Sequence, residues 1–377
     1  MISAEVLPPT FPLEDLRADW NRLYGAGQWE PSVSFGWSRA MIRNHLARDS
    51  NWFIVLLRRS GEITGIVPMA RAEQRVLGRT VTTLSPIQER NNTHSDLLIR
   101  DYDPELLAAW LEALTRSGGR WDLLQLSRLI EDGPLCAALA GRLPRCGRAF
   151  ELVPQQPSYF LPLPASHDDY LASRSAKFRN HLKRAEKKLA AAGACALTLV
   201  RDGDDFEAAY RELLAIEAAS WKHGHGTAIS AVPHQTGFYR DLAESALRAG
   251  TLHLTFLRVN GVAVAYNLGL VANDCYYYLK TSVRDEHKSS GAATVGRAWL
   301  IRQLIGDGLP KFDFPAEPYE WERQWTSELR WHRSLLVYNR TANAGLLRLI
   351  RFARALLRRR GERDLVHSEA RPSRAET

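Results

Sequence analysis

The chain has 377 residues, of which 45% are hydrophobic and 24% charged, a balance typical of a folded globular protein. This length allows two ordinary domains. The first thirty residues contain no basic region followed by an apolar run, and no window reaches the roughly 18 uncharged apolar residues that span a bilayer. The composition therefore argues against a secreted or membrane-spanning protein and predicts a cytoplasmic one.

The formal charge of +8 is concentrated at the C-terminal end. Residues 346–377 contain nine Arg and four acidic residues, a net of +5, which leaves +3 (8 − 5) for the rest of the chain. A general nucleic-acid-binding surface, and so a nucleic-acid partner, is not expected. The four cysteines, Cys136, Cys146, Cys195 and Cys275, are far apart and form no CxxC pair. They are predicted to be packed thiols that form neither a disulfide frame nor a zinc site.

The first half begins with an apolar stripe at helical spacing over residues 13–23, and a second helix is expected over 35–46. Residues 52–70 predict two strands around a Ser-Gly turn. Further strands are expected near Val81 and Leu97, then a helix over 104–116 and a buried strand over 121–126. The proline-rich residues 153–164 predict a linker between an N-terminal half, 1–152, and a C-terminal half, 165–342.

The second half repeats part of this order. Residues 251–271 again predict a hairpin, and at an offset of 200 residues three identities coincide: Leu57 with Leu257, Arg58 with Arg258, and Gly61 with Gly261. A strand (274–282), a helix (292–305), a short strand (311–314), a Trp-rich helical stretch and a last strand (331–338) follow. The pattern predicts a tandem duplication and a mixed α/β sheet flanked by helices.

The C-terminal segment has two parts. Over residues 346–360, leucines fall on one face of a helix and arginines on the other, so 343–360 is predicted to be a basic amphipathic helix. Such a helix lies on the inner, anionic face of a cytoplasmic membrane or packs on its own domain. Residues 361–377 have no periodicity and are expected to be disordered.

The turn between the predicted strand at 274–282 and the following helix consists of small residues. Small residues allow a ligand to approach the backbone, and free N–H groups at a helix start attract phosphate. The turn is therefore a candidate pyrophosphate site, although a simple Ser-Gly cap of the helix would also explain it. Its members are Lys288, Ser289, Ser290, Gly291, Ala292 and Ala293.

This turn resembles the Gln/Arg-x-x-Gly-x-Gly/Ala sequence with which the GNAT superfamily holds the pyrophosphate of coenzyme A, except that Lys288 stands at the first position. The wider chain is similar to the acetyltransferase family associated with bacterial cellulose biosynthesis, whose members resemble Fem-type tandem GNAT proteins. The likeness rests on PSVSFGW after the Trp20 helix, KFRNHLKRAEKKLAAAG, EAASWK with GFYRDLAESALRAGTLHL, and FDFPAEPYEWERQW. One departure is Glu320, where that family has Lys, so any role of that lysine is in doubt here.

The resemblance implies two GNAT-type α/β halves and an acyl-CoA substrate, with no metal. In that fold the strands beside the pyrophosphate turn separate and the pantetheine arm fills the gap, which would place the thioester near Tyr278 and Lys280. Attack by an amine needs a base and a proton for the leaving thiolate. We expect Glu317 first and Asp313 second as the base, with Tyr319 as the acid. Alternatively, both carboxylates only cap the next helix.

Two further clusters stand out. The loop WKHGHG predicts a substrate-side segment, with Trp221, Lys222 and His223 as contacts and His225 as a titratable catalytic group. The alternatives are a plain exposed turn and, less favoured, a metal site at His-x-His, which has no Cys or carboxylate at fitting spacing. The helix over 174–188 carries Arg179 and Lys183 among several basic residues, which suit coenzyme phosphates, an anionic substrate, a tRNA or lipid headgroups, or else form a solvated face. Residues 90–98 lie where the first half would have its own pyrophosphate turn, and they contain no glycine. We expect this half to shape the acceptor site.

The sequence thus predicts an N-acyltransferase that uses acyl-CoA or an acyl carrier protein as donor. The expected acceptor is an amine, either on a membrane lipid precursor such as a sphingoid base, as in ceramide-type synthesis, or on an envelope polysaccharide sugar. The alternatives are a Fem-type transferase that uses aminoacyl-tRNA and a non-catalytic accessory protein of polysaccharide synthesis.

Overall fold

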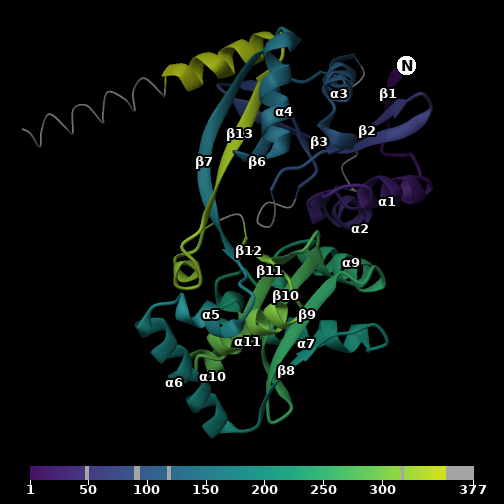
Figure 1. Ribbon diagram of the computed structural model, residues 1–377. Helices are drawn as coiled ribbons and strands as arrows, with labels where there is room; N and C mark the ends of the chain where they lie inside the picture. Colours follow the sequence, from purple (N-terminus) through teal and green to yellow (C-terminus); the bar gives the residue numbers. More distant parts are fainter. Residues whose placement is uncertain (47–50, 89–93, 117–119, 316–317, 354–377) are drawn as a thin grey trace, which may run out of the picture.

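The computed structural model describes residues 1–46, 51–88, 94–116, 120–315 and 318–353. Two lobes, one from each half of the sequence, are joined by two strands that run between them, β7 (Ala149–Pro162) and β13 (Leu329–Tyr338), as Figure 1 shows. Within the described part of the chain, no helix has both the length and the apolar character needed to cross a bilayer.

The N-terminal lobe is a mixed sheet covered by helices. Its strands are β1 (Ile2–Leu7), β2 (Trp52–Arg59), β3 (Glu62–Val76), β4 (Arg79–Pro86), β5 (Leu98–Ile99) and β6 (Leu123–Ile130). Its helices are η1 (Leu13–Leu16), α1 (Arg17–Gly25), η2 (Pro31–Val33), α2 (Phe35–Met41), the π-helix η3 (Ile42–Leu46), η4 (Arg100–Tyr102), α3 (Pro104–Arg116), α4 (Pro134–Arg142) and η5 (Leu143–Cys146).

The C-terminal lobe has the same layers. Its strands are β8 (Cys195–Leu199), β9 (Leu252–Val259), β10 (Val262–Ala272), β11 (Cys275–Val283) and β12 (Lys311–Asp313). Its helices are α5 (His167–Ala172), α6 (Ala176–Ala192), α7 (Phe206–Ala218), α8 (Trp221–Gly224), η6 (Ile229–Ala231), α9 (Gln235–Arg248), α10 (Asp285–Lys288), α11 (Ala292–Gly306) and η7 (Glu320–Gln324). The expected mixed α/β fold is confirmed.

The two lobes have matching strand orders. The continuous sheet runs β1-β2-β3-β4-β6-β13-β7-β12-β11-β10-β9-β8, so β4 with β6 and β11 with β12 occupy corresponding places. Both of these pairs are parallel, and the chain crosses between their strands through α3 in one lobe and α11 in the other. Such crossovers require a helix-sized connection, which explains the position of each helix.

The two repeated hairpins, β2–β3 and β9–β10, also share the register in which their strands pair. Leu57 pairs with Gly65 and Leu257 with Ala265, and in each hairpin the register shifts by one residue before the turn. Arg58 donates to the Gly61 carbonyl at 3.3 Å, and Arg258 to the Gly261 carbonyl at 3.1 Å. Both glycines have positive φ, 87° and 81°. The same offset of 200 residues therefore relates sequence, register and turn, as a duplication predicts.

The lobes share strands. β13, from the C-terminal half, lies between β6 and β7, while β7 continues from β13 to β12. Residues 153–164, predicted as a linker, thus lie mostly within β7 and belong to the sheet. Pro is tolerated in strands where its missing N–H is not needed for the ladder, and the sequence does not reveal those places. α2 and α9 also meet between the lobes, where Trp37 packs edge-on against Phe238 at 5.7 Å.

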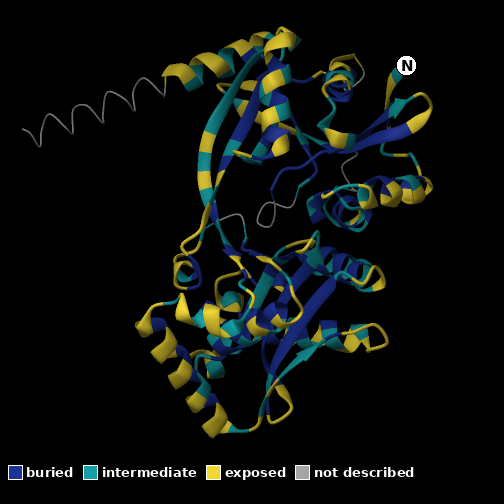
Figure 2. Ribbon diagram, in the orientation of Figure 1, coloured by how far each residue is buried: buried dark blue, intermediate teal, exposed yellow. Residues whose placement is uncertain are grey.

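Burial follows the sheet, whose strands form the darkest part of Figure 2. At the C-terminal end, a helix over residues 342–353 packs Ala344 and Leu347 beside β13, and Arg351 pairs with Glu151. Leu349 and Phe352 on the same helix remain 67% and 64% exposed. The predicted disordered tail and the end of the amphipathic helix lie outside the described residues.

Candidate functional site

Beyond the end of β12, the facing edge of β11 has no strand partner among the described residues, and we call the place beside this edge the opening. The parallel ladder of the two strands ends at the pair Tyr277 and Asp313, but β11 continues to Val283 with β10 as its only strand neighbour among the described residues. A bulge in the β10–β11 register leaves Leu279 without a partner on β10. The backbone of β11 therefore has an edge at which an extended chain can bind, beside the Tyr278 and Lys280 positions expected for a thioester.

The predicted pyrophosphate turn follows this opening. Gly291 precedes α11 with φ +80°, a left-handed conformation that favours glycine. A Cβ at Gly291 would also lie 2.7 Å from the Cβ of Ala185 on α6. Lys188 of the same helix donates to the Ser289 carbonyl at 2.9 Å. The glycine is thus required by helix packing, while the N–H groups of Ala292 and Ala293 at the start of α11 suit a phosphate.

Aromatic rings surround an arginine on the α11 face of the opening. Arg297 lies 4.0 Å from the Trp321 ring and 5.2 Å from the Trp325 ring, and it donates to the Tyr278 hydroxyl at 2.9 Å. Phe314 packs against Trp321 with ring centroids 5.9 Å apart. These residues give the site a largely apolar wall with one buried cation. Sequence reasoning included Tyr278 but missed the others, which come from three separate elements.

Glu322 of η7 belongs to this wall. Its side chain is fully buried; one carboxylate oxygen accepts from the Tyr319 N–H at 3.1 Å, and the other has no hydrogen-bond partner among the described residues. Burial raises the pKa of Glu322 to about 8, against the lowering effect of that hydrogen bond and of Arg297. The carboxyl is therefore mainly neutral at pH 7 and can donate a proton.

The opposite face of the opening holds a buried charge cluster. Asp313 pairs with Arg330, and His94 Nε2 lies 3.2 Å from the Asp313 carboxylate. His332 stacks on His94 with ring centroids 4.8 Å apart. Burial alone would raise the pKa of Asp313, but Arg330 and His94 outweigh it and hold the pKa at about 2. Asp313 therefore stays ionised at neutral pH, and its low pKa makes it a weaker base than a carboxylate whose pKa lies near 7.

Two carboxyls of the N-terminal lobe lie close to this cluster. Burial raises the pKa of Glu30 to about 7 and that of Asp96 to about 6. Asp96 accepts from the Glu30 N–H at 3.0 Å and from the Tyr102 hydroxyl at 2.8 Å. Glu30 is close enough to Tyr277 to affect its pKa, so it lies on that face of β11. Sequence analysis missed Glu30, because no motif links residue 30 to residue 277.

The WKHGHG loop is fixed to β11 and to the start of α10. Lys222 donates to buried Glu217 at 2.7 Å and also to the Thr281 carbonyl. The Trp221 N–H donates to Asp285 at 2.9 Å. These contacts give Lys222 an anchoring role ahead of a substrate contact. Both histidines of the loop, His223 and His225, are exposed to solvent. His225 packs edge-on against Trp221.

The remaining predicted site residues come from several elements. Arg179 donates to the carbonyl of Arg174, and Lys183 is exposed on α6. The Lys280 ammonium lies 5.4 Å from the Tyr239 ring centre. Tyr319 is 45% exposed and stacks on Trp321. Glu317 lies outside the described residues.

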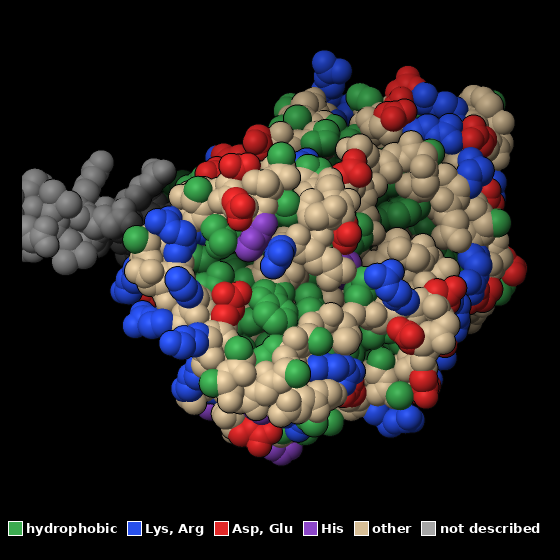
Figure 3. Space-filling view, turned by 60° about the horizontal axis from the view of Figure 1, so that its bottom comes forward, with side chains coloured by type: hydrophobic (Ala, Val, Ile, Leu, Met, Phe, Trp, Pro, Cys, Tyr) green, Lys and Arg blue, Asp and Glu red, His purple; other side chains and the backbone are tan. Residues whose placement is uncertain are grey.

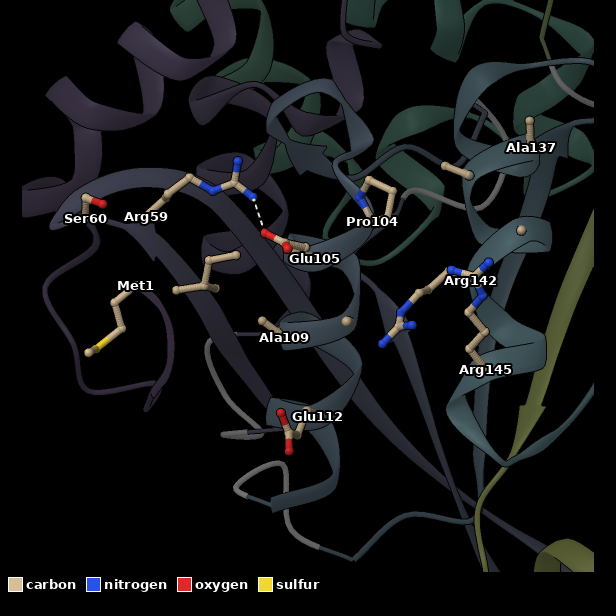
Figure 4. Close-up of a pocket in the computed structure, with 14 residues that line it drawn as sticks. Met1, Arg59, Ser60, Pro104, Glu105, Ala109, Glu112, Ala137, Arg142 and Arg145 are labelled. Carbon is tan, nitrogen blue, oxygen red and sulfur yellow. Dashed lines mark hydrogen bonds and ion pairs between the residues drawn. The ribbon is translucent and has the colours of Figure 1, made fainter.

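A separate hollow of about 1040 Å³ lies on the N-terminal lobe, between α3, α4 and the start of β1. Figure 4 shows Arg142 and Arg145 on its α4 side and an ion pair of Arg59 with Glu105, 3.1 Å apart, on the other. It contains none of the residues predicted from the sequence, so the opening beside β11 remains the candidate active site.

Comparisons with known proteins identify the domain in which this candidate site lies. Residues 176–323 match the family model described as acetyltransferase (GNAT) domain. No curated protein matches the sequence. The C-terminal lobe thus contains a GNAT domain, the domain of an acyltransferase. The narrower resemblance to cellulose-biosynthesis acetyltransferases is not supported by these comparisons and stays an expectation.

Solved structures share the whole two-lobed fold at low identity. FemX matches with a TM-score of 0.58 and 13% identity over 92% of this chain and 99% of its own. The C-terminal domain of a putative lysylphosphatidylglycerol synthetase from Agrobacterium fabrum gives 0.56 and 12%, over 89% and 95%. A conserved protein of unknown function from Bacteroides thetaiotaomicron gives 0.56 and 14%, over 90% and 100%. Such likeness shows the fold alone.

Proposed function

We propose that this protein is an N-acyltransferase that moves an acyl group from acyl-CoA or an acyl carrier protein to an amine. The observation that carries the proposal is the edge of β11 that has no strand partner among the described residues beyond the pair Tyr277 and Asp313, next to the N-terminus of α11. A pantetheine arm can run along the open edge of β11, while its phosphate lies at the turn over residues 288–293. The match of residues 176–323 to a GNAT domain supports this reading.

The reaction forms a bond between the amine nitrogen and the thioester carbon and breaks the carbon–sulfur bond. The amine must lose a proton, and the thiolate must gain one. Glu30, whose pKa is about 7, suits the base on the face toward the N-terminal lobe. Glu322, neutral below its pKa of about 8, suits the proton donor on the α11 face. The N-terminal lobe would then supply acceptor contacts.

For the acceptor we propose an amine on a membrane lipid precursor, such as a sphingoid base, ahead of an envelope polysaccharide sugar. The helix over 342–353 favours the lipid, because it leaves Leu349 and Phe352 exposed beside basic residues. Cosedimentation with vesicles of phosphatidylglycerol and phosphatidylcholine tests this surface. The double variant Leu349→Ser, Phe352→Ser should lose binding that the wild type shows; equal binding by both would remove this support.

The reaction itself is tested by thiol release from hexadecanoyl-CoA with sphinganine or glucosamine as acceptor, followed by mass spectrometry of the product. We expect thiol release that depends on sphinganine and an N-hexadecanoyl product, both greatly reduced in Glu30→Gln. The alternative, Fem-type transfer, would show no thiol release but would move lysine or alanine from a charged tRNA. An accessory protein would do neither.

A further inference from the structure

The outer surface of α6 is strongly basic. The helix has six Lys or Arg and a single acidic residue, Glu186, which is engaged with the Trp299 indole at 2.9 Å. Apolar residues at helical spacing face α11 and the sheet, and the basic residues face solvent. Figure 3 shows Lys and Arg side chains gathered over this region, whereas most of the remaining view mixes both signs of charge.

This basic face lies beside the phosphate turn. Ala185 is in close approach to Gly291, and Lys188 bonds to the Ser289 carbonyl. Toward its N-terminal end, α6 packs Phe178 against Trp325 of the aromatic wall, with ring centroids 5.0 Å apart. The first part of the helix therefore runs from the aromatic wall to the turn, and the rest continues past the turn to Ala192.

The cationic side chains of α6 form no ion pair with an acidic residue in the described part of the protein. Lys177, Lys183 and Lys187 are exposed, and none of them forms an ion pair with another described residue. Like charges placed this densely repel each other. One diphosphate at the turn would engage only the middle of α6, where Ala185 lies against Gly291. At 1.5 Å per residue, a helix of 17 residues is about 25 Å long, so most of it extends beyond that contact.

The size of the basic surface distinguishes between macromolecular donors. A tRNA backbone requires positive charge over a wide surface, but apart from residues 346–377 the chain has a net charge of only +3 (8 − 5). A single basic helix instead matches the footprint of one acidic helix on a small protein. Such a protein would deliver its phosphopantetheine phosphate to the turn and its thioester to the opening beside β11.

We propose that α6 is the docking surface for an acidic acyl carrier protein, which presents the acyl thioester to the opening beside β11. The proposal rests on the proposed function, since it names the source of the acyl group. Complementary charge on the two proteins raises the rate of encounter and depends on salt, whereas free acyl-CoA requires only the turn and the opening.

The test compares hexadecanoyl carrier protein with hexadecanoyl-CoA as donors, with sphinganine as acceptor. In a variant with Lys177→Glu, Arg184→Glu and Lys187→Glu, all exposed on α6, kcat/KM for the carrier protein should fall about tenfold or more. The value for acyl-CoA should stay within about threefold. A milder variant with Gln at the same positions should show a smaller loss in the same direction. A matched control reverses the charge of three exposed arginines in the N-terminal lobe, Arg75→Glu, Arg120→Glu and Arg145→Glu. It should change kcat/KM for neither donor.

The outcomes separate the two proposals. No turnover with either donor refutes the proposed function. Turnover with acyl-CoA but not with the carrier protein overturns the docking proposal alone, as does an equal loss with both donors in the α6 variant. A gel shift of charged tRNA that disappears in the α6 variant would assign the surface to nucleic acid instead.

Discussion

Replacing Glu322 by glutamine should change how stability depends on pH. The pKa of this buried carboxyl is raised from 4.5 to about 8, so the folded state holds its proton more tightly than the unfolded state. The contribution of this carboxyl to the free energy of unfolding is therefore fully present below pH 4.5 and is lost as the pH rises toward 8. Between pH 6 and 8 the linkage relation gives a loss of about 2 kcal/mol in the wild type.

A glutamine side chain cannot ionise, so the Glu322→Gln variant should escape that loss. Its free energy of unfolding, relative to wild type, should increase by about 2 kcal/mol from pH 6 to pH 8 in urea titrations. Glu320→Gln, an exposed change in the same 3₁₀-helix, is the control and should show no such trend. A pH-independent difference for Glu322→Gln would mean that the carboxyl is already ionised at pH 6, which would remove it as a proton donor.

Three further changes follow from the site and its packing. Glu30→Gln should reduce kcat/KM by about 10²- to 10⁴-fold and abolish the rise in rate that the wild type shows as pH passes through about 7; an unchanged profile would exclude Glu30 as base. Gly291→Ala should cost about 1–3 kcal/mol more than Gly308→Ala, because both have positive φ but only Gly291 faces a clash; equal thermal stability would contradict this. Asp313→Asn should cost about 3–5 kcal/mol, since it leaves Arg330 buried without its partner; a loss below about 1 kcal/mol in urea unfolding would show that the charge is solvated.

Local patterns predicted most of the elements that build the opening. The expected helix over 104–116 and strand over 274–282 lie within one residue of α3 and β11, because each is strongly periodic and has clear ends. The hairpin repeat was visible through Leu57, Gly61 and their counterparts 200 residues later, because a tight turn and a buried strand position constrain residue type. The position of the phosphate turn followed from small residues between a strand and a helix.

Contacts between distant segments could not be predicted in this way. β13 lies between β6 and β7, and no feature of residues 329–338 indicates a place in the other lobe's sheet. His94 meets Asp313 across 219 residues of sequence, and Glu30 reaches the same region from the start of the chain. The raised pKa of Glu30 depends on burial between the lobes, which composition and spacing do not encode.

Lys222 was singled out by an unusual sequence and also has partners within the fold. In an unusual sequence such as WKHGHG, a lysine suggests contact with a substrate. In the structure its charge balances Glu217, which is fully buried and also accepts from the Tyr266 hydroxyl at 2.6 Å. A buried carboxylate needs a partner, so the lysine is used within the fold. The acidic residue five positions earlier was the only local signal.

The most direct test of the account is whether the opening beside β11 binds an acyl thioester. Thermal unfolding should be measured with acetyl-, octanoyl- and hexadecanoyl-CoA, for the wild type and for Ser290→Glu, which places a negative charge at the start of α11. A ligand at ~100 times its Kd adds ~2.7 kcal/mol of stability, so we expect a clear rise in Tm that grows with chain length and is absent in the variant. No rise with any thioester, or an equal rise in both proteins, would contradict an acyl-CoA site at this turn.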